Sequence, residues 1–161
     1  MCAIVDTCSI GSVFNRKAQF HNEYAPLLSW IESAQGRIVF GGKKYLREIK
    51  DMEFFKRLLQ DYARQGKLVR LDDAAVDKYA SQAKAKIRTA RFNDEHIVAM
   101  VAVSGCRVVC TDDDEAIPYI TKKELYKSPV RPPKIYNRKV HKHLCGDDNV
   151  APICRRKKRI V

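Results

Sequence analysis

Residues 2–7 are Cys-Ala-Ile-Val-Asp-Thr, and residues 107–113 are Arg-Val-Val-Cys-Thr-Asp-Asp. In both stretches a short apolar run ends in threonine and acidic residues. Short runs rich in Val and Ile, bounded by Gly or acidic residues, are typical of buried strands. Similar runs occur elsewhere in the chain. We predict four strands, over residues 2–5, 37–40, 67–71 and 107–110.

Helical patterns separate the predicted strands. Residues 24–34 carry one apolar face, and residues 45–62 place apolar side chains at steps of three and four, which predicts one long amphipathic helix. A third helix is predicted over residues 76–87, and residues 93–104 are apolar nearly all round, which predicts a buried helix. This alternation predicts an α/β fold, with three α/β/α layers around a parallel sheet of about four to five strands.

Positive charge is concentrated near the C-terminus. Residues 122–161 contain 13 Lys or Arg and 3 Asp or Glu, a balance of +10, whereas residues 1–121 contain 18 and 16, a balance of +2. Such a cationic segment favours a polyanionic partner, nucleic acid first, although it could also serve only solubility. We expect one folded domain over residues 1–125 and a basic, partly disordered extension over residues 126–161.

The hydropathy pattern indicates the cellular compartment, and the compartment in turn bears on the redox state of the cysteines. No apolar run approaches the length of a membrane span, and the first ten residues lack the basic region of a signal peptide. We therefore expect a cytoplasmic protein without a membrane partner. In that setting we expect the six cysteines to be reduced thiols and not a disulfide framework.

Acidic residues follow the predicted strands and open the predicted helices. Asp6 follows the first strand, and residues 112–114, all Asp, follow the fourth. Asp94 stands in the first turn of the buried helix, and Glu48 lies near the start of the helix after the second strand. Ligands of an open parallel sheet bind outside the carboxyl ends of its strands. We expect these acids to converge at that edge.

A cluster of carboxylates favours a particular chemistry. Close carboxylates repel one another, so a cation is expected among them. Oxygen ligands favour hard ions such as Mg²⁺ or Mn²⁺, which can activate water and neutralise the charge of a phosphoryl group. Together with the cationic segment, this predicts hydrolysis of a phosphodiester. Each acid taken alone could instead be a turn residue, a helix cap or a solvated side chain.

Four short motifs resemble those of the PIN-domain family, whose members include the VapC-like ribonucleases. They are Ile-Val-Asp-Thr at 4–7, Glu48 in the helix after the second strand, Asn-Asp-Glu-His-Ile-Val-Ala at 93–99, and Val-Val-Cys-Thr-Asp-Asp at 108–113. They occur in the family's order and cover about residues 1–120 of the chain. The segment after residue 121 resembles nothing that we can assign.

The resemblance implies a ligand set and an activity. Four catalytic carboxylates would hold one or two Mg²⁺ or Mn²⁺ ions for the hydrolysis of RNA: Asp6, Glu48, Asp94 and Asp113. Asp112, next to Asp113, could also bind metal. Thr7 and Thr111 would orient the carboxylates through hydrogen bonds. The resemblance further implies a homodimer, and an endoribonuclease acting as an RNA-processing enzyme or as the toxin of a toxin–antitoxin pair, with an antitoxin protein as partner.

Basic residues in two places are candidates for contacts to RNA phosphates. Lys84, Arg88 and Arg91 lie in and after the third helix, where they could equally form its solvated face. The second group closes the chain: Arg155, Arg156, Lys157, Lys158 and Arg159.

Other interpretations compete with the nuclease. A PIN-like scaffold could bind RNA or a protein without cleaving it. His141, His143, Cys145 and Cys154 include zinc-type ligands, but their spacing fits no standard zinc motif. For His96, next to the predicted ligand Asp94, capping or packing is favoured over proton transfer.

Overall fold

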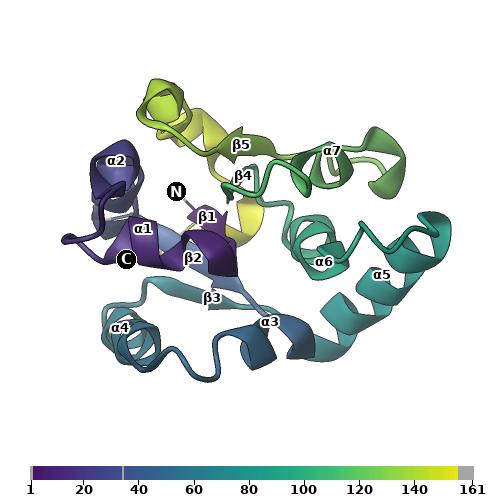
Figure 1. Ribbon diagram of the computed structural model, residues 1–161, viewed down its shortest axis with the longest axis horizontal. Coiled ribbons are helices and arrows are strands. Elements are labelled where there is room, and N and C mark those ends of the chain that lie inside the picture. The colour runs from purple at the N-terminus through teal and green to yellow at the C-terminus, as the bar shows by residue number, and fades with distance from the viewer. Residues whose placement is uncertain (1, 34, 156–161) are drawn as a thin grey trace, which may run out of the picture.

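The computed structural model describes residues 2–33 and 35–155, and Figure 1 shows it as a ribbon. Its centre is one parallel sheet of five strands in the order β3-β2-β1-β4-β5. The strands are β1 (Cys2–Val5), β2 (Arg37–Phe40), β3 (Leu68–Arg70), β4 (Val108–Cys110) and β5 (Lys134–Tyr136). The predicted α/β fold with a central parallel sheet is therefore confirmed.

Helices cover both faces of this sheet. They are α1 (Ile10–Phe14), α2 (His21–Glu32), α3 (Lys43–Glu48), α4 (Glu53–Arg64), α5 (Asp73–Lys86), α6 (Glu95–Ser104) and α7 (Ile117–Ile120). Short 3-10 turns are η1 (Thr7–Ser9), η2 (Lys123–Leu125), η3 (Lys139–Leu144), η4 (Asp147–Asn149) and η5 (Pro152–Cys154). In Figure 1, α2 and α4 lie on one side of the sheet, and α5 and α6 lie on the other. This arrangement gives the three expected layers.

The central strand β1 aligns the two acidic motifs. Every residue of β1 and of β4 is fully buried, as expected for strands covered by helices on both faces. Ile4 pairs with Val109 and Val5 with Cys110, and the amide of Asp6 donates to the carbonyl of Cys110 at 2.8 Å. The ladder therefore continues one residue past β1 and places Asp6 beside the end of β4.

The single long helix predicted over residues 45–62 is wrong. The chain forms α3, then a turn over residues 49–52, then α4. Met52, the residue before α4, has φ −89° and ψ 73°, which is not helical. The apolar spacing continues through the turn because Ile49 and Phe55 are both buried, so periodicity alone did not reveal the break. As a separate element, α3 can approach the ends of the strands.

The boundary predicted at residue 125 does not separate the domain from an extension. Strand β5 lies beyond it and pairs with β4. Tyr136 of β5 is fully buried, and its hydroxyl donates to the carbonyl of Glu23 in α2 at 3.0 Å. Residues 126–155 therefore belong to the same fold as residues 2–125. The predicted disorder of residues 156–161 lies outside the described part of the chain.

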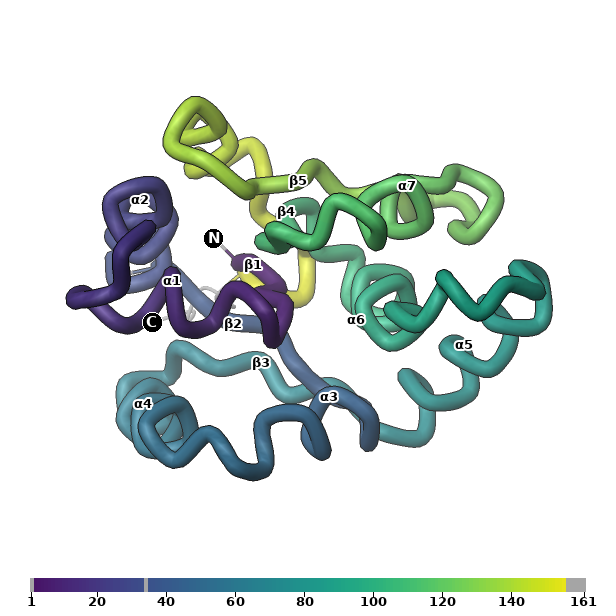
Figure 2. Tube along the Cα trace, viewed as in Figure 1, coloured from purple at the N-terminus to yellow at the C-terminus, as the bar shows by residue number. Residues whose placement is uncertain are grey.

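The prediction that all cysteines are reduced thiols is wrong for one pair. Cys2, the first residue of β1, forms a disulfide with Cys154 of η5 across a sequence separation of 152 residues. Figure 2 shows the C-terminal segment returning beside β1. The prediction failed because folding, and not sequence spacing, brings the two cysteines together. The bond also removes Cys154 from the zinc-type ligands considered above.

Candidate metal centre at the carboxyl edge of the sheet

Asp6 is held at the end of β1 by a neighbouring strand. It is 3% exposed, and its Oδ2 accepts a 2.7 Å hydrogen bond from the hydroxyl of Thr111, the residue after β4. Thr111 is itself fully buried. The β1–β4 register explains this contact, because both residues leave the sheet at the same level. Thr111 therefore contacts Asp6, the carboxylate after β1, and the family resemblance implies an orienting role for such a threonine.

The start of α6 brings Asp94 and His96 to the same edge. Asp94 precedes the first residue of α6, yet its side chain makes no capping hydrogen bond. One ligand atom from each of Asp6, Asp94 and His96 lies within 4.8 Å of the others. Two carboxylates and an imidazole in this arrangement could hold a metal ion.

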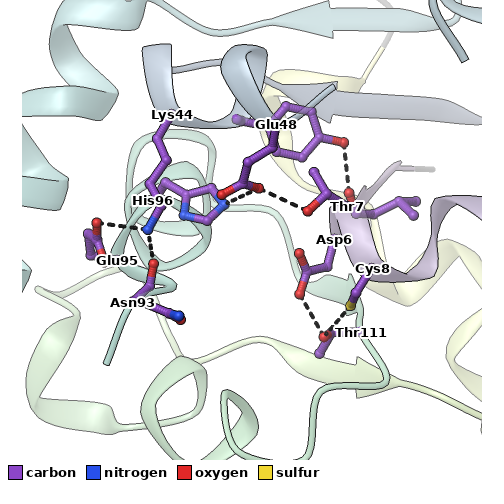
Figure 3. A network of polar contacts seen from close by, with 11 residues as sticks. Asp6, Thr7, Cys8, Lys44, Glu48, Asn93, Glu95, His96 and Thr111 are labelled. Atoms are coloured by element: carbon purple, nitrogen blue, oxygen red, sulfur yellow. Dashed lines mark hydrogen bonds and ion pairs between the residues drawn. The ribbon is translucent and has the colours of Figure 1, made fainter. Parts of the chain in front are cut away.

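Glu48 reaches the same region from α3, as Figure 3 shows. Its Oε2 accepts a 2.9 Å hydrogen bond from the hydroxyl of Thr7 and lies 3.3 Å from Nε2 of His96. Helix α3 is itself fixed to β1, because the hydroxyl of the buried Tyr45 donates to the carbonyl of Val5 at 2.7 Å. These contacts set Glu48 beside the three-residue cluster.

A glycine allows α3 to begin so close to α5. Gly42, which precedes α3, has φ +86°, a conformation that other residues rarely adopt. A Cβ atom at this position would lie 2.6 Å from Cγ1 of Val76 in α5. The amide of Gly42 donates to Oδ1 of Asp73, the first residue of α5, at 2.7 Å.

The acids of the centre have pKa values displaced in opposite directions. Burial, and then the charge of Asp6, raise the pKa of Asp94 to about 6, and Asp113 adds to this. Burial also acts to raise the pKa of Glu48, but His96, Thr7 and the charge of Lys44 outweigh it, so the pKa lies below its ordinary value. Asp94 therefore resists ionisation more than an exposed carboxyl group does, chiefly because it is partly buried and secondly because Asp6 is near.

Lys44 supplies positive charge next to the centre. Its Nζ donates to the carbonyl of Asn93 and, at 3.0 Å, to Oε1 of Glu95 (Figure 3). The lysine thereby joins α3 to the first turn of α6. It also pairs with Glu95, the residue that follows Asp94 in the sequence.

The imidazole of His96 has an unusual environment. Its side chain is 2% exposed. Neither ring nitrogen has a hydrogen-bond partner among residues 2–33 and 35–155, and the 3.3 Å approach to Glu48 is an ion-pair distance without hydrogen-bond geometry. Buried polar atoms without partners are uncommon in proteins and call for an explanation. Sequence reasoning favoured capping or packing for His96, yet the structure places it in the cluster.

Two acids in the loop after β4, Asp113 and Asp112, accept hydrogen bonds from different groups. Oδ1 of Asp113 accepts hydrogen bonds from the amides of Glu115 and Ala116, at 2.9 and 3.1 Å, so it shapes the turn into α7. Its charge still contributes to the raised pKa of Asp94. Asp112 is exposed, and its Oδ1 accepts from the hydroxyl of Ser9 at 3.1 Å.

Asp112 is not a member of the three-residue cluster. Together with Asp114 and Arg138 it lines a separate cavity of about 490 Å³ beside α2. Of the predicted metal ligands, Asp6 and Asp94 are in the cluster, Asp113 is close enough to affect Asp94, and Asp112 lies outside the cluster.

Cys8 lies near the acids but is a poor nucleophile. Partial burial, and then the charge of Asp6, raise the pKa of its thiol to about 12. Only a thiolate attacks readily, and very little thiolate forms near neutral pH at such a pKa.

A basic groove opens beside the centre, between α3 and α5. It has a volume of about 700 Å³, and four cationic side chains line it: Lys43, Lys44, Arg47 and Lys84. Two acids also line it: Asp77, which pairs with Lys43 at 3.9 Å, and Glu95, which pairs with Lys44 and links the groove to the start of α6.

The predicted RNA-binding residues have different positions relative to the groove. Lys84 lines it, whereas Arg88 and Arg91 are exposed and lie outside its lining. Arg155 is exposed next to Cys154, whose disulfide holds it near the opposite end of β1 from Asp6. Arg156, Lys157, Lys158 and Arg159 lie outside the described residues.

Comparisons with known proteins found no relative. No protein-family model, curated protein or solved structure matches the chain. The resemblance to the PIN-domain family therefore stays a prediction from four short motifs. In the described parts of the chain, no helix is long and apolar enough to cross a membrane.

Proposed function

We propose that this protein is a metal-dependent endoribonuclease of the PIN type. One observation carries the proposal: two carboxylates and a buried imidazole without hydrogen-bond partners converge at the carboxyl edge of a parallel sheet. Open parallel sheets bind their ligands at this edge. The basic groove beside α3 and the net charge of +12 favour a polyanionic substrate.

Each residue of the centre has a role in this proposal. Asp6 and Asp94 would hold Mg²⁺ or Mn²⁺, with Asp113 as a candidate further ligand. The ion would supply Lewis acidity toward the phosphate and lower the pKa of the attacking water. Thr111 would keep Asp6 oriented through its 2.7 Å hydrogen bond.

Glu48 is better suited to orient the attacking water than to act as the general base that accepts its proton. Its pKa lies below the ordinary value, so it is ionised near neutral pH and is a weak base. Thr7 fixes one of its oxygens at 2.9 Å. The carboxylate would then accept a hydrogen bond from the attacking water and align it with the phosphorus.

The groove between α3 and α5 would hold the substrate's backbone. Lys43, Arg47 and Lys84 line it without belonging to the acidic centre, and Lys44 connects the two. Cations contribute to binding by neutralising phosphates, so this surface favours affinity without selecting a sequence.

The test is cleavage of a mixed single-stranded RNA pool by the purified protein in Mn²⁺, Mg²⁺ or EDTA. Asp94→Asn is the test variant and Asp114→Asn, at an exposed position in the loop after β4, is the matched control. We expect metal-dependent cleavage by the wild type and the control, and none by Asp94→Asn. Equal cleavage by Asp94→Asn would contradict the proposed centre. Cleavage of a DNA pool alone would change the substrate class.

The alternative function is an RNA-binding module that does not cleave, and the groove supports it because its cations do not depend on a metal. Tight RNA binding without cleavage in any metal would favour this alternative. A toxin's role, an antitoxin partner and a homodimer rest on the family resemblance alone.

A further inference from the structure

We infer that His96 is a nitrogen ligand of the metal centre, and that the centre therefore selects a transition-metal ion such as Mn²⁺ over Mg²⁺. This inference rests on the proposed function only for the existence of a metal at the site. It goes further by assigning a ligand that differs from an all-carboxylate set, and by assigning the class of ion.

The first argument comes from what His96 lacks. A buried imidazole normally has a hydrogen-bond partner for at least one nitrogen, because leaving both without one costs stability. The side chain of His96 is 2% exposed, and among the described residues Nδ1 has no partner, while Nε2 has only the 3.3 Å ion-pair contact with Oε2 of Glu48. A role in packing alone leaves this cost unexplained, whereas a bound cation would use the lone pair of one nitrogen.

The second argument comes from the groups that surround the ring. One of its nitrogens lies within 4.8 Å of carboxylate oxygens of both Asp6 and Asp94. Glu48 stands 3.3 Å from Nε2 and is itself held by Thr7. Metal-binding histidines are usually oriented by a neighbouring carboxylate of this kind. The centre thus provides both a ligand arrangement and the support that a ligand histidine requires.

The choice of ion follows from ligand chemistry. Mg²⁺ prefers oxygen ligands and retains its waters, and it gains little from an imidazole. First-row transition-metal ions accept nitrogen more readily, and their affinity for mixed sites rises from Mn²⁺ onward. Two carboxylates with one imidazole therefore favour Mn²⁺ over Mg²⁺, whereas carboxylates alone would discriminate less.

The direct test is pulsed electron paramagnetic resonance of the full-length protein loaded with Mn²⁺. Coordinated imidazole produces a ¹⁴N modulation from the metal-bound nitrogen. We expect this signal in the wild type and in His143→Asn, an exposed histidine distant in sequence. We expect its loss in His96→Asn, which offers a neutral oxygen instead. A wild-type spectrum without ¹⁴N modulation would overturn the inference, whether or not any variant folds.

A competition titration tests the choice of ion without relying on activity. We expect the wild type to bind Mn²⁺ at least about tenfold more tightly than Mg²⁺, and His96→Asn to lose most of this preference. Equal affinities in the wild type would refute the selectivity, and failure to bind Mn²⁺ would refute the site. Nitrogen coordination without RNA cleavage would support the ligand and reject the nuclease. Cleavage without nitrogen coordination would do the reverse.

Discussion

The hydroxyl of Thr111 donates a 2.7 Å hydrogen bond to Oδ2 of Asp6, and the two residues are 105 positions apart in the sequence. The same hydroxyl accepts a hydrogen bond from the amide of Asp113 at 3.2 Å. One buried side chain therefore orients the carboxylate after β1 and fixes the start of the loop after β4.

Replacing Thr111 by Val should weaken metal binding while preserving the fold. Valine keeps the buried volume but removes the donor, which leaves Asp6 less well oriented. Loss of such a supporting contact typically lowers metal affinity by about 10- to 100-fold. Titration with Mn²⁺ measures this effect. Thr121→Val, which removes a hydroxyl bonded to the carbonyl of Ile117 in α7, is the control. Unchanged affinity in Thr111→Val would mean that the hydroxyl does not orient a ligand.

Asp94 should make stability depend on pH in the absence of metal. Its folded-state pKa is about 6, above the ordinary value of 3.8, so between these values the folded protein binds a proton that the unfolded chain has lost. Stability therefore falls as the pH rises through this window, and above about pH 6 the ionised carboxylate carries its full cost.

We thus expect Asp94→Asn to be more stable than the wild type above pH 6, by roughly 1 kcal/mol after allowance for solvent screening at this partly exposed position. The difference should disappear below about pH 4. Urea unfolding in EDTA across this range is the measurement, with Asp114→Asn as the control. A difference independent of pH would assign the effect to packing.

The groove between α3 and α5 should contribute to the salt dependence of RNA binding. Lys43 and Arg47 are exposed and line the groove. Their double replacement by Ala should weaken binding and lower the slope of log affinity against log salt by about 1.4, since each contact to single-stranded nucleic acid contributes about 0.7.

Filter binding with Asp94→Asn protein, which we expect to be inactive, measures the slope without cleavage of the RNA. Arg57 and Arg64, exposed on α4 across the sheet, provide the matched double variant. Equal slopes for both pairs would place the RNA elsewhere.

The disulfide between Cys2 and Cys154 should stabilise the fold. Joining residues 152 positions apart restricts the unfolded chain, an effect of roughly 2–5 kcal/mol. For a domain of this size that corresponds to a decrease in Tm of roughly 5–20 °C when the bond is absent. Thermal unfolding of Cys154→Ser, compared with reduced and oxidised wild type, measures it. Cys145→Ser removes a free, partly buried thiol and should behave as the oxidised wild type. Identical Tm values for oxidised and reduced protein would contradict the expectation.

The sequence was informative about the centre of the sheet because β1, β2 and β4 are almost wholly buried between helices. Such strands are continuous apolar runs, and the residues that follow them mark the carboxyl edge. This reasoning placed Asp6 and the residues after β4 at one edge, as the structure does. Strand β5 was missed because it has only three residues and follows two prolines, so its apolar pattern is too short to recognise.

Other features depend on distances that a linear pattern does not contain. His96 lies two residues after Asp94, and its proximity to Asp6 exists only once α6 packs beside β1. A histidine in the first turn of a helix that opens with a predicted ligand was the available signal. Asp112 and Asp113 are adjacent in sequence, yet their side chains make different contacts. Asp112 accepts a hydrogen bond from Ser9, whereas Asp113 accepts from the amides of residues 115 and 116.

The bond between Cys2 and Cys154 makes the described chain a covalent ring that contains every element from β1 to η5. Gln65 and Gly66, exposed between α4 and β3, form a turn suited to a protease. A single nick there would open the ring without releasing a fragment, so Asp6 and Asp94 would stay tethered in one molecule although they fall on different pieces of backbone. Such nicked protein would migrate as one species until its sulfurs were reduced, and only then as two.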